Sequence, residues 1–151
     1  MMWGIIFPNG LVAVKKVQGH QTSVNYIDIL SSFGVPLMKL NLKPHFGIVQ
    51  DNSRTHTSKV VNNFMLSRGL KVIKWPALSP DLNLIENVWK MLSDIVYDGL
   101  QPKNLKELET RIIEAVNQIN TMRRQTIVDL FEGFSDRMIK VLTGKGCIIN
   151  K

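Results

Sequence analysis

Two carboxylates, Asp51 and Glu86, lie where a chain commonly positions metal ligands. Asp51 directly follows the short apolar run 46–50, and Glu86 lies near the start of a segment with helical periodicity. Cleavage and transfer of phosphodiester strands use two divalent ions about 3.5–4 Å apart. Carboxylates supply the hard oxygen ligands that Mg²⁺ prefers. The residue types therefore fit metal-dependent phosphoryl transfer, although their separation of 34 intervening residues carries little weight by itself.

Each of these carboxylates also has a structural alternative. Asp51 is followed by Asn52, and the side chains of both residue types hydrogen-bond to local backbone in turns. Asn83 and Glu86 fit a capping box, in which the Glu86 side chain returns to the backbone N–H of Asn83. On the residues alone, both alternatives stay open.

The segments before the first carboxylate predict a hairpin and a helix. In residues 2–17, two β-rich runs flank an Asn-Gly pair, which favours an antiparallel hairpin. A helix should begin at Thr22 or Ser23 and end at Gly34 and Pro36. Its apolar face is expected to contain Val24, Ile27, Leu30 and Phe33.

The next segments predict strand, helix and strand. The run 46–50 is too short for a helix and reads as a buried strand that ends at the first carboxylate. A helix capped by Thr55 or Thr57 should stop at Gly69, and residues 70–75 should form the following strand. The first carboxylate would then lie at the carboxyl end of a strand.

Helices are predicted for the remainder. The first begins within 81–83, carries the second carboxylate and ends near Gly99. The second is capped by Asn104, and the third covers 127–142 with a break at Gly133. Strands that alternate with helices indicate an α/β fold. Because there is no internal repeat or linker, we expect a single domain.

Composition narrows the classes of partner. The net charge of +7 makes a polyanion such as DNA a reasonable partner, and a solvated basic surface is the alternative. No stretch approaches the about 20 apolar residues of a membrane span, so no membrane partner is expected. The single cysteine, Cys147, favours a reducing compartment, the cytosol or the nucleus.

Two longer motifs resemble those of a known family. Residues 50–58 (QDNSRTHTS) resemble the second-aspartate motif of the mariner superfamily of DNA transposases, and residues 75–89 (WPALSPDLNLIENVW) resemble its glutamate motif. Their separation matches the nematode-type branch. The likeness extends to residues 2–4 and 26–30, and more loosely to 122–124.

The resemblance implies a ribonuclease-H-like mixed sheet with flanking helices and C-terminal helices. It also implies a three-carboxylate site for Mg²⁺ or Mn²⁺, with Asp51 as the second acid and Glu86 as the third. The first acid, its strand and the N-terminal helix-turn-helix of the family are expected to be absent. We thus expect a truncated catalytic domain over 1–151, with a ribonuclease-H-like portion at 1–100 and a helical portion at 101–151.

Further candidates are residues that could support the metal ligands and residues that could bind DNA. Asn52, His56 and Asp81 are candidates to support the metal ligands, with a solvated loop or a helix start as alternatives. The candidates for contact with DNA phosphates are Arg123, Arg124, Lys140 and Lys145. Trp75 and Trp89 are expected in the core.

The implied function is cut-and-paste DNA transposition and integration in the nucleus, with DNA as partner, a homodimer as a candidate assembly and no small-molecule substrate. Residues 1–50 contain one acid, Asp28, so the isolated chain is expected to be inactive. The alternative is a domesticated or decayed remnant that binds nucleic acid or dimerises without catalysis.

Overall fold

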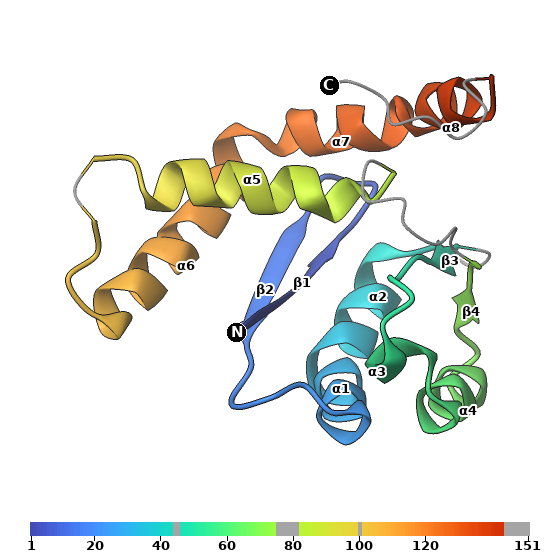
Figure 1. The fold of residues 1–151 in the computed structure, drawn as a ribbon. Helices are drawn as coiled ribbons and strands as arrows, with labels where there is room; N and C mark the ends of the chain where they lie inside the picture. Colours follow the sequence, from blue (N-terminus) through green and yellow to red (C-terminus); the bar gives the residue numbers. More distant parts are fainter. Residues whose placement is uncertain (44–45, 75–81, 100, 144–151) are drawn as a thin grey trace. The chain divides into compact units, whose positions relative to one another are not determined.

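The protein divides into two compact units (Figure 1). The computed structural model describes residues 1–43, 46–74, 82–99 and 101–143. Unit 1 comprises Met1–Trp3 and Lys15–Leu78, and unit 2 comprises Gly4–Val14 and Ser79–Lys151. The expected division of one domain at residue 100 stays a prediction. Asp51 belongs to unit 1 and Glu86 to unit 2, so each carboxylate is described within its own unit.

The predicted hairpin is confirmed. Strands β1 (Met2–Ile6) and β2 (Val12–Lys16) form a two-stranded sheet. The Val17 N–H donates to the Met1 carbonyl and the Phe7 N–H donates to the Leu11 carbonyl, each at 2.9 Å, so the strands run antiparallel. Gly10 has a φ of 86° in the turn, a conformation that costs glycine little.

A helical segment follows the hairpin and is longer than predicted. It consists of α1 (Ser23–Ile29), the π-helical turn η1 (Leu30–Gly34) and α2 (Val35–Asn41). The predicted stop at Gly34 and Pro36 is wrong. Pro36 lies in the first turn of α2, where its missing N–H matters least. Gly34 is helical and buried, and an added Cβ would lie 3.3 Å from the Trp3 ring, so this glycine permits close packing.

The predicted apolar face of α1 is also wrong in part. Val24 is 66% exposed, whereas Tyr26, Ile29 and Leu30 are buried. The buried face includes a tyrosine, because its ring is apolar and its hydroxyl finds a hydrogen-bond partner. Leu30 is buried as predicted, whereas apolar spacing without Tyr26 assigned Val24 wrongly to the buried face.

The second sheet of unit 1 is short and parallel. Strand β3 (Gly47–Ile48) pairs with β4 (Lys71–Val72), with Gly47 opposite Lys71. The two strands lie within the predicted runs, but the expected burial of 46–50 is wrong, since Phe46 and Val49 are exposed and Gly47, Ile48 and Gln50 are only partly buried.

Two helices connect these strands where one was predicted. They are α3 (Arg54–Thr57), capped by Ser53, and α4 (Lys59–Ser67). Ser58 is extended, with a ψ of 150°, and separates them. The predicted stop is confirmed, because Gly69 has a φ of 68° just after the C-cap of α4.

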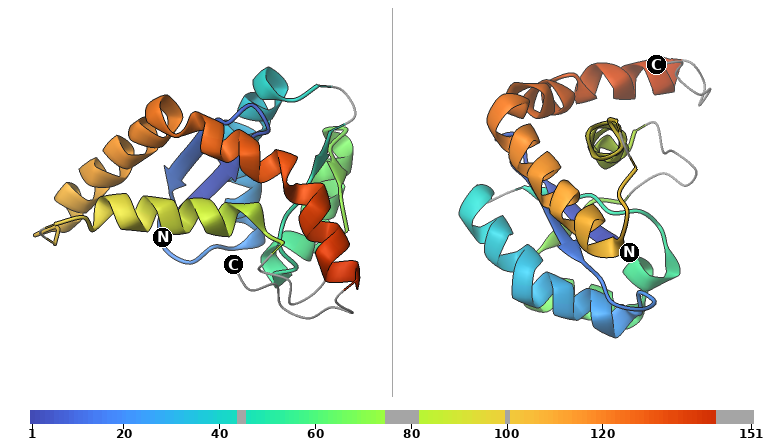
Figure 2. Two further views of the ribbon diagram at one scale, coloured as in Figure 1. Left: turned by 90° about the horizontal axis from the view of Figure 1, so that it is seen from above. Right: turned by 90° about the vertical axis from the view of Figure 1, so that its left-hand side faces the viewer.

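Unit 2 is built from the hairpin turn and helices α5 (Leu84–Val96), α6 (Leu105–Met122), α7 (Arg124–Glu132) and α8 (Phe134–Thr143). Figure 2 shows α6 and α7 beside α5. The predicted Asn104 cap is confirmed, and so is the break at Gly133. The core of the unit consists of Val12, Val88, Leu92, Val96, Ala115, Val116, Ile119 and Ile127.

An asparagine fastens α6 to the hairpin. The Asn120 amide accepts a hydrogen bond from the Val12 N–H at 2.8 Å and donates one to the Val12 carbonyl at 2.9 Å. Both backbone groups of a buried residue are thus satisfied by one side chain. In the described parts of the chain, no helix has the length and apolar content needed to cross a membrane.

Candidate functional site

The Asp51 carboxylate is held in place at one oxygen and is exposed. Oδ1 accepts a hydrogen bond from the Ser53 N–H at 3.0 Å and lies 2.6 Å from His56 Nδ1. Because an ionised carboxylate only accepts hydrogen bonds, the proton in the second contact belongs to the imidazole. Neither of these two contacts uses Oδ2, and the Ser53 side chain adds a further hydrogen bond to the carboxylate. The side chain is 59% exposed, so solvent or a cation can reach it.

The turn alternative for Asp51 is therefore present, but it uses one oxygen. The Asp51 side chain accepts a hydrogen bond from the N–H of Ser53, two residues later in the chain. This bond is the one that closes an aspartate turn. The turn fixes the rotamer of the carboxylate, which stays exposed to a ligand. Both roles coexist in the geometry of this loop.

His56 is packed against α1. Its side chain is 15% exposed, and its ring centroid lies 4.2 Å from that of the buried Tyr26. Nε2 is buried and finds no hydrogen-bond partner among the residues that the structure describes. The imidazole is thereby held by ring packing on one side and by the carboxylate at Nδ1.

Gln50 joins the two aromatic residues. The Tyr26 hydroxyl donates to Gln50 Oε1 at 2.8 Å, and Gln50 Nε2 donates to the His56 carbonyl at 3.1 Å. The Gln50 side chain thus links the buried Tyr26 to the backbone of the segment that carries Asp51. Such connected polar contacts restrict conformation more than isolated ones do.

Two further hydrogen bonds attach this loop to the start of α1. Ser23 Oγ donates to the Thr55 carbonyl at 3.3 Å, and Thr55 Oγ1 donates to the Gln21 carbonyl at 3.2 Å. Ser53 Oγ accepts from the His56 N–H at 3.4 Å and caps α3. The loop that carries Asp51 is therefore held by neighbours on both sides.

These surroundings shift two pKa values in opposite directions. Burial raises the pKa of the Asp51 carboxyl, but the Ser53 and His56 hydrogen bonds and the charge of His56 outweigh it, so the pKa falls below its usual value. Burial, followed by the nearby Asp51 charge, raises the pKa of the Tyr26 hydroxyl well above its usual range. At neutral pH the site therefore combines an ionised carboxylate with a neutral tyrosine.

Glu86 lies in the first turn of α5 and is exposed. The capping-box alternative predicts a hydrogen bond from the Asn83 N–H to the Glu86 side chain. No such bond is present between these two described residues, and the Asn83 side chain makes no cap bond either. The carboxylate is left open to solvent near the positive end of the helix dipole.

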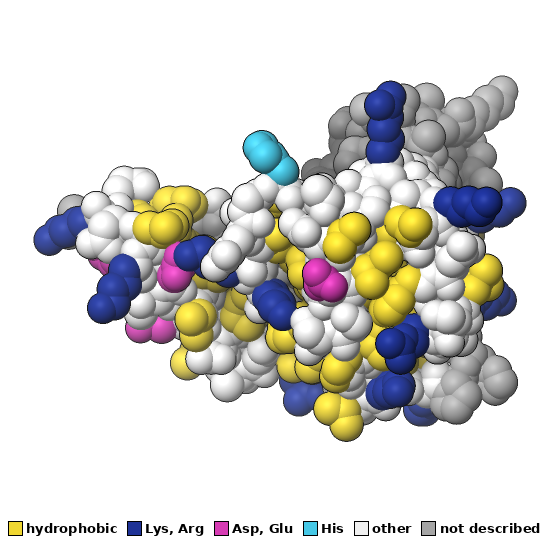
Figure 3. Space-filling view, turned by 90° about the horizontal axis from the view of Figure 1, so that it is seen from below, with side chains coloured by type: hydrophobic (Ala, Val, Ile, Leu, Met, Phe, Trp, Pro, Cys, Tyr) yellow, Lys and Arg dark blue, Asp and Glu magenta, His cyan; other side chains and the backbone are white. Residues whose placement is uncertain are grey.

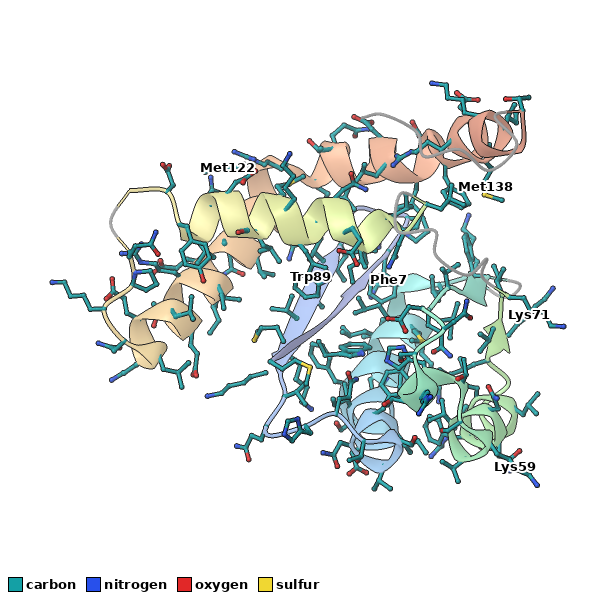
Figure 4. The ribbon with its side chains drawn as sticks, in the orientation of Figure 1. Phe7, Lys59, Lys71, Trp89, Met122 and Met138 are labelled. Carbon is teal, nitrogen blue, oxygen red and sulfur yellow. The ribbon has the colours of Figure 1, made fainter. Side chains whose placement is uncertain are left out.

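Trp89 fixes α5 against the hairpin, as Figure 4 shows. An ideal Cβ on Gly4 would lie 2.7 and 2.8 Å from ring carbons of Trp89 and 3.4 Å from Ile85 Cδ1. Only glycine lets the ring approach this closely. Trp89 packs against the core of unit 2, which confirms its predicted place. Trp75 lies outside the described residues.

The remaining predicted residues differ in their surroundings. Asn52, Arg123 and Lys140 are exposed. Arg124 Nε donates to the Asn9 carbonyl at 2.7 Å, so this arginine holds the hairpin turn. Asp81 and Lys145 lie outside the described residues.

The donor chemistry fits a hard divalent cation. Asp51 and Glu86 each offer an exposed carboxylate, and carboxylate oxygens are what Mg²⁺ and Mn²⁺ bind. No group of three or more His, Cys, Asp or Glu side chains placed to hold a metal occurs among the residues described. The fit therefore concerns ligand type at two separate positions.

Tyr26 and Gln50 were not predicted as site residues. Gln50 directly precedes Asp51, and Tyr26 is a polar-tipped aromatic within an apolar helix face. These two features are the signals in the sequence that could have identified Gln50 and Tyr26 as site residues. Their contact with His56 depends on how α1 packs against the loop, which sequence spacing does not encode.

Comparison with known proteins decides the family. A family model described as DDE superfamily endonuclease matches residues 2–109, most of the chain. The chain belongs to this family. The matched region includes both Asp51 and Glu86. The predicted relation to mariner-type transposases is confirmed by the relatives and solved structures below.

Relatives of this DDE superfamily chain include nematode transposases. It is 27% identical over 151 residues to the transposable element Tc3 transposase of Caenorhabditis elegans, covering 99% of this chain and 45% of that protein. It is 30% identical over 146 residues to the Tcb1 transposase of Caenorhabditis briggsae, covering 97% and 52%. The chain thus spans about half the length of these curated relatives.

Solved structures give the fold. The Mos1 transposase catalytic domain with Raltegravir and Mn matches with a TM-score of 0.71 at 14% identity, covering 99% of this chain and 82% of that one. The same domain with Raltegravir and Mg matches with a TM-score of 0.67 at 12% identity. The predicted ribonuclease-H-like fold class is confirmed.

Proposed function

We propose that this chain is catalytic-domain sequence of a DNA transposase, in which Asp51 and Glu86 bind Mg²⁺ or Mn²⁺. The observation that carries the proposal is the Asp51 carboxylate, which is fixed through Oδ1 and is exposed. The family match and the nematode transposase relatives support the reaction class. The reaction is cut-and-paste transposition, with cleavage of transposon ends and their integration into target DNA.

The protein's own residues prepare the metal ligands. Asp51 is ionised at neutral pH, as an ordinary aspartate carboxyl is, and its lowered pKa keeps it ionised under more acidic conditions. Glu86 offers an exposed carboxylate on a rigid helix of thirteen residues. When bound, divalent ions activate the attacking hydroxyl and stabilise charge on the leaving oxygen of the phosphodiester.

We assign His56 as a positioning residue for Asp51. Its Nδ1–H bond selects one carboxylate orientation, and its stacking on Tyr26 prevents the imidazole from turning away. A partner that orients a metal-ligating group typically contributes 10–100-fold to metal affinity or activity. Asn52 and Asp81 remain proposed supporting residues.

Mn²⁺ titration of the whole chain, followed by the loss of the free-ion electron paramagnetic resonance signal, tests the metal assignment. Asp51→Asn should weaken binding at least tenfold, since a direct ligand should contribute no less than a partner that orients it. Asp28→Asn, the other acid of unit 1, is the matched control and should bind as the wild type does.

For Glu86 the same titration uses Glu86→Gln, with Asp94→Asn as the control on the same helix. Both acids of α5 are exposed, so the control removes an equal charge from a similar environment. Equal affinities for Glu86→Gln and Asp94→Asn would contradict the assignment of Glu86.

We further propose that a polypeptide of these 151 residues does not cut DNA alone. Two of the three acids that such a site uses are assigned, and Asp28, the one acid in residues 1–50, lies in α1. Incubation with transposon-end DNA and Mn²⁺ should leave the DNA intact. Nicking that Asp51→Ala abolishes would overturn this proposal. For the transposase function proposed above, we also propose a nuclear location and assembly as a homodimer.

A further inference from the structure

The positive charge of the protein is concentrated in one unit. Unit 1 contains nine Lys and Arg residues and two Asp residues, whereas unit 2 contains ten basic and ten acidic residues. Unit 1 therefore accounts for the whole formal charge of +7, and unit 2 is neutral. The overall charge of the sequence conceals this asymmetry.

Four cations of unit 1 belong to neighbouring elements. Arg54 begins α3, Lys59 begins α4, Lys71 lies on β4 and Lys74 follows it, and we call these four the α3–β4 cations. Helix α4 contacts both α3 and β4. Figure 4 shows Lys59 and Lys71 projecting outward from their elements.

The α3–β4 cations are available to a ligand. All four are exposed, and none forms an ion pair with another described residue. Figure 3 shows a face on which Lys and Arg side chains are widespread and acidic side chains are few. Exposed, unpaired cations in a region with two acids produce a positive potential that attracts polyanions.

Three of the four arginines of unit 2, in contrast, form hydrogen bonds or ion pairs within that unit, whereas Arg123 is exposed. Arg111 bonds Glu107 at 2.7 Å, Arg124 bonds the Asn9 carbonyl, and Arg137 Nη2 bonds the Leu130 carbonyl at 2.9 Å. These guanidinium groups already serve the structure of unit 2. The neutral unit therefore offers less to a phosphate backbone than its ten cations suggest.

We propose that unit 1, through the α3–β4 cations, is the surface that contacts the phosphate backbone of duplex DNA. The inference deepens the proposed function and rests on it for the choice of DNA as partner. Arg54 lies three residues after Asp51, so this surface is continuous in sequence with the proposed metal ligand. It also moves the main DNA contact away from Arg123, Arg124, Lys140 and Lys145.

Two variants of the complete chain with equal net charge test the proposal. The first changes the α3–β4 cations Arg54, Lys59, Lys71 and Lys74 to Gln. The second is the matched control and changes four exposed lysines of unit 2, Lys90, Lys103, Lys106 and Lys140, to Gln. Binding to a fluorescent DNA duplex is measured by anisotropy at several salt concentrations in EDTA.

The first variant should bind more weakly, and its slope of log K against log salt should become shallower by about 0.9 for each cation that contacts a phosphate. The control should keep the wild-type slope. Equal losses in both variants, a larger loss in the control, or no binding by the wild type would overturn the proposal. Because EDTA removes divalent metal, a failure of the metal assignment at Asp51 and Glu86 leaves this result unaffected.

Discussion

Gly4→Ala tests the close packing that fixes α5 against the hairpin. The new Cβ would lie 2.7 Å from a Trp89 ring carbon, a separation that forces the ring or the strand to move. Overpacking in a well-packed region costs about 1–3 kcal/mol. Alanine recovers about 0.5–1 kcal/mol because glycine loses more backbone entropy in a strand. We therefore expect a net loss of about 0.5–2 kcal/mol.

Thermal unfolding followed by circular dichroism measures this loss. For a chain of this size, each kcal/mol lowers the Tm by about 2–4 °C. The double variant Gly4→Ala with Trp89→Leu removes the obstructing ring, so in the Trp89→Leu background the glycine substitution should cost nothing. If Gly4→Ala leaves the Tm unchanged, or lowers it equally in both backgrounds, the packing argument is wrong.

Three further predictions concern other contacts. His56→Ala should lower Mn²⁺ affinity about 10–100-fold, and His56→Asn, which keeps an N–H donor toward Asp51, should recover part of it; unchanged affinity in a titration would contradict the positioning role. Hydrogen bonds from the Lys103 N–H and Arg111 lower the pKa of the Glu107 carboxyl from 4.5, so its contribution to stability is complete above pH 4.5 and disappears as pH falls through the lower folded-state pKa. The difference in free energy of unfolding between wild type and Glu107→Gln should shrink over that range, and a difference that stays constant would refute the linkage. Asn120→Ala should cost about 1–3 kcal/mol in urea unfolding, because the buried Val12 backbone loses both partners; a negligible cost would show that water replaces the amide.

Local chemistry predicted the elements whose signals are local. The Asn9-Gly10 turn, the Asn104 cap, and Gly69 as a helix stop all act within a few residues, and the structure contains each of them. The same holds for the break at Gly133. In these places the backbone conformation is decided by residues that are adjacent in sequence.

Predictions failed where packing decides the outcome. Gly34 and Pro36 read as a helix stop, but the helix continues because Gly34 receives the Trp3 ring and Pro36 needs no N–H in the first turn of α2. Val24 was assigned to the buried face, which Tyr26 occupies instead. Neither outcome can be derived without knowing the partner surface.

The candidate site was predicted at the level of single residues. Motif resemblance selected Asp51 and Glu86, with His56 as a candidate to support the metal ligands, and in the structure His56 Nδ1 lies 2.6 Å from Asp51 Oδ1. The involvement of Tyr26 and Gln50 was missed, since it requires α1 to lie beside the loop. The division of charge between the units was hidden as well, because it follows from which segments pack together.

The central claim is that Asp51 and Glu86 are ligands of a divalent metal ion. Mn²⁺ affinity of Asp51→Asn and Glu86→Gln, measured beside the controls Asp28→Asn and Asp94→Asn, tests it most directly. Both ligand variants should bind Mn²⁺ at least about tenfold more weakly than the wild type, and both controls should bind as the wild type does. Ligand variants that bind Mn²⁺ as the wild type does would contradict the account.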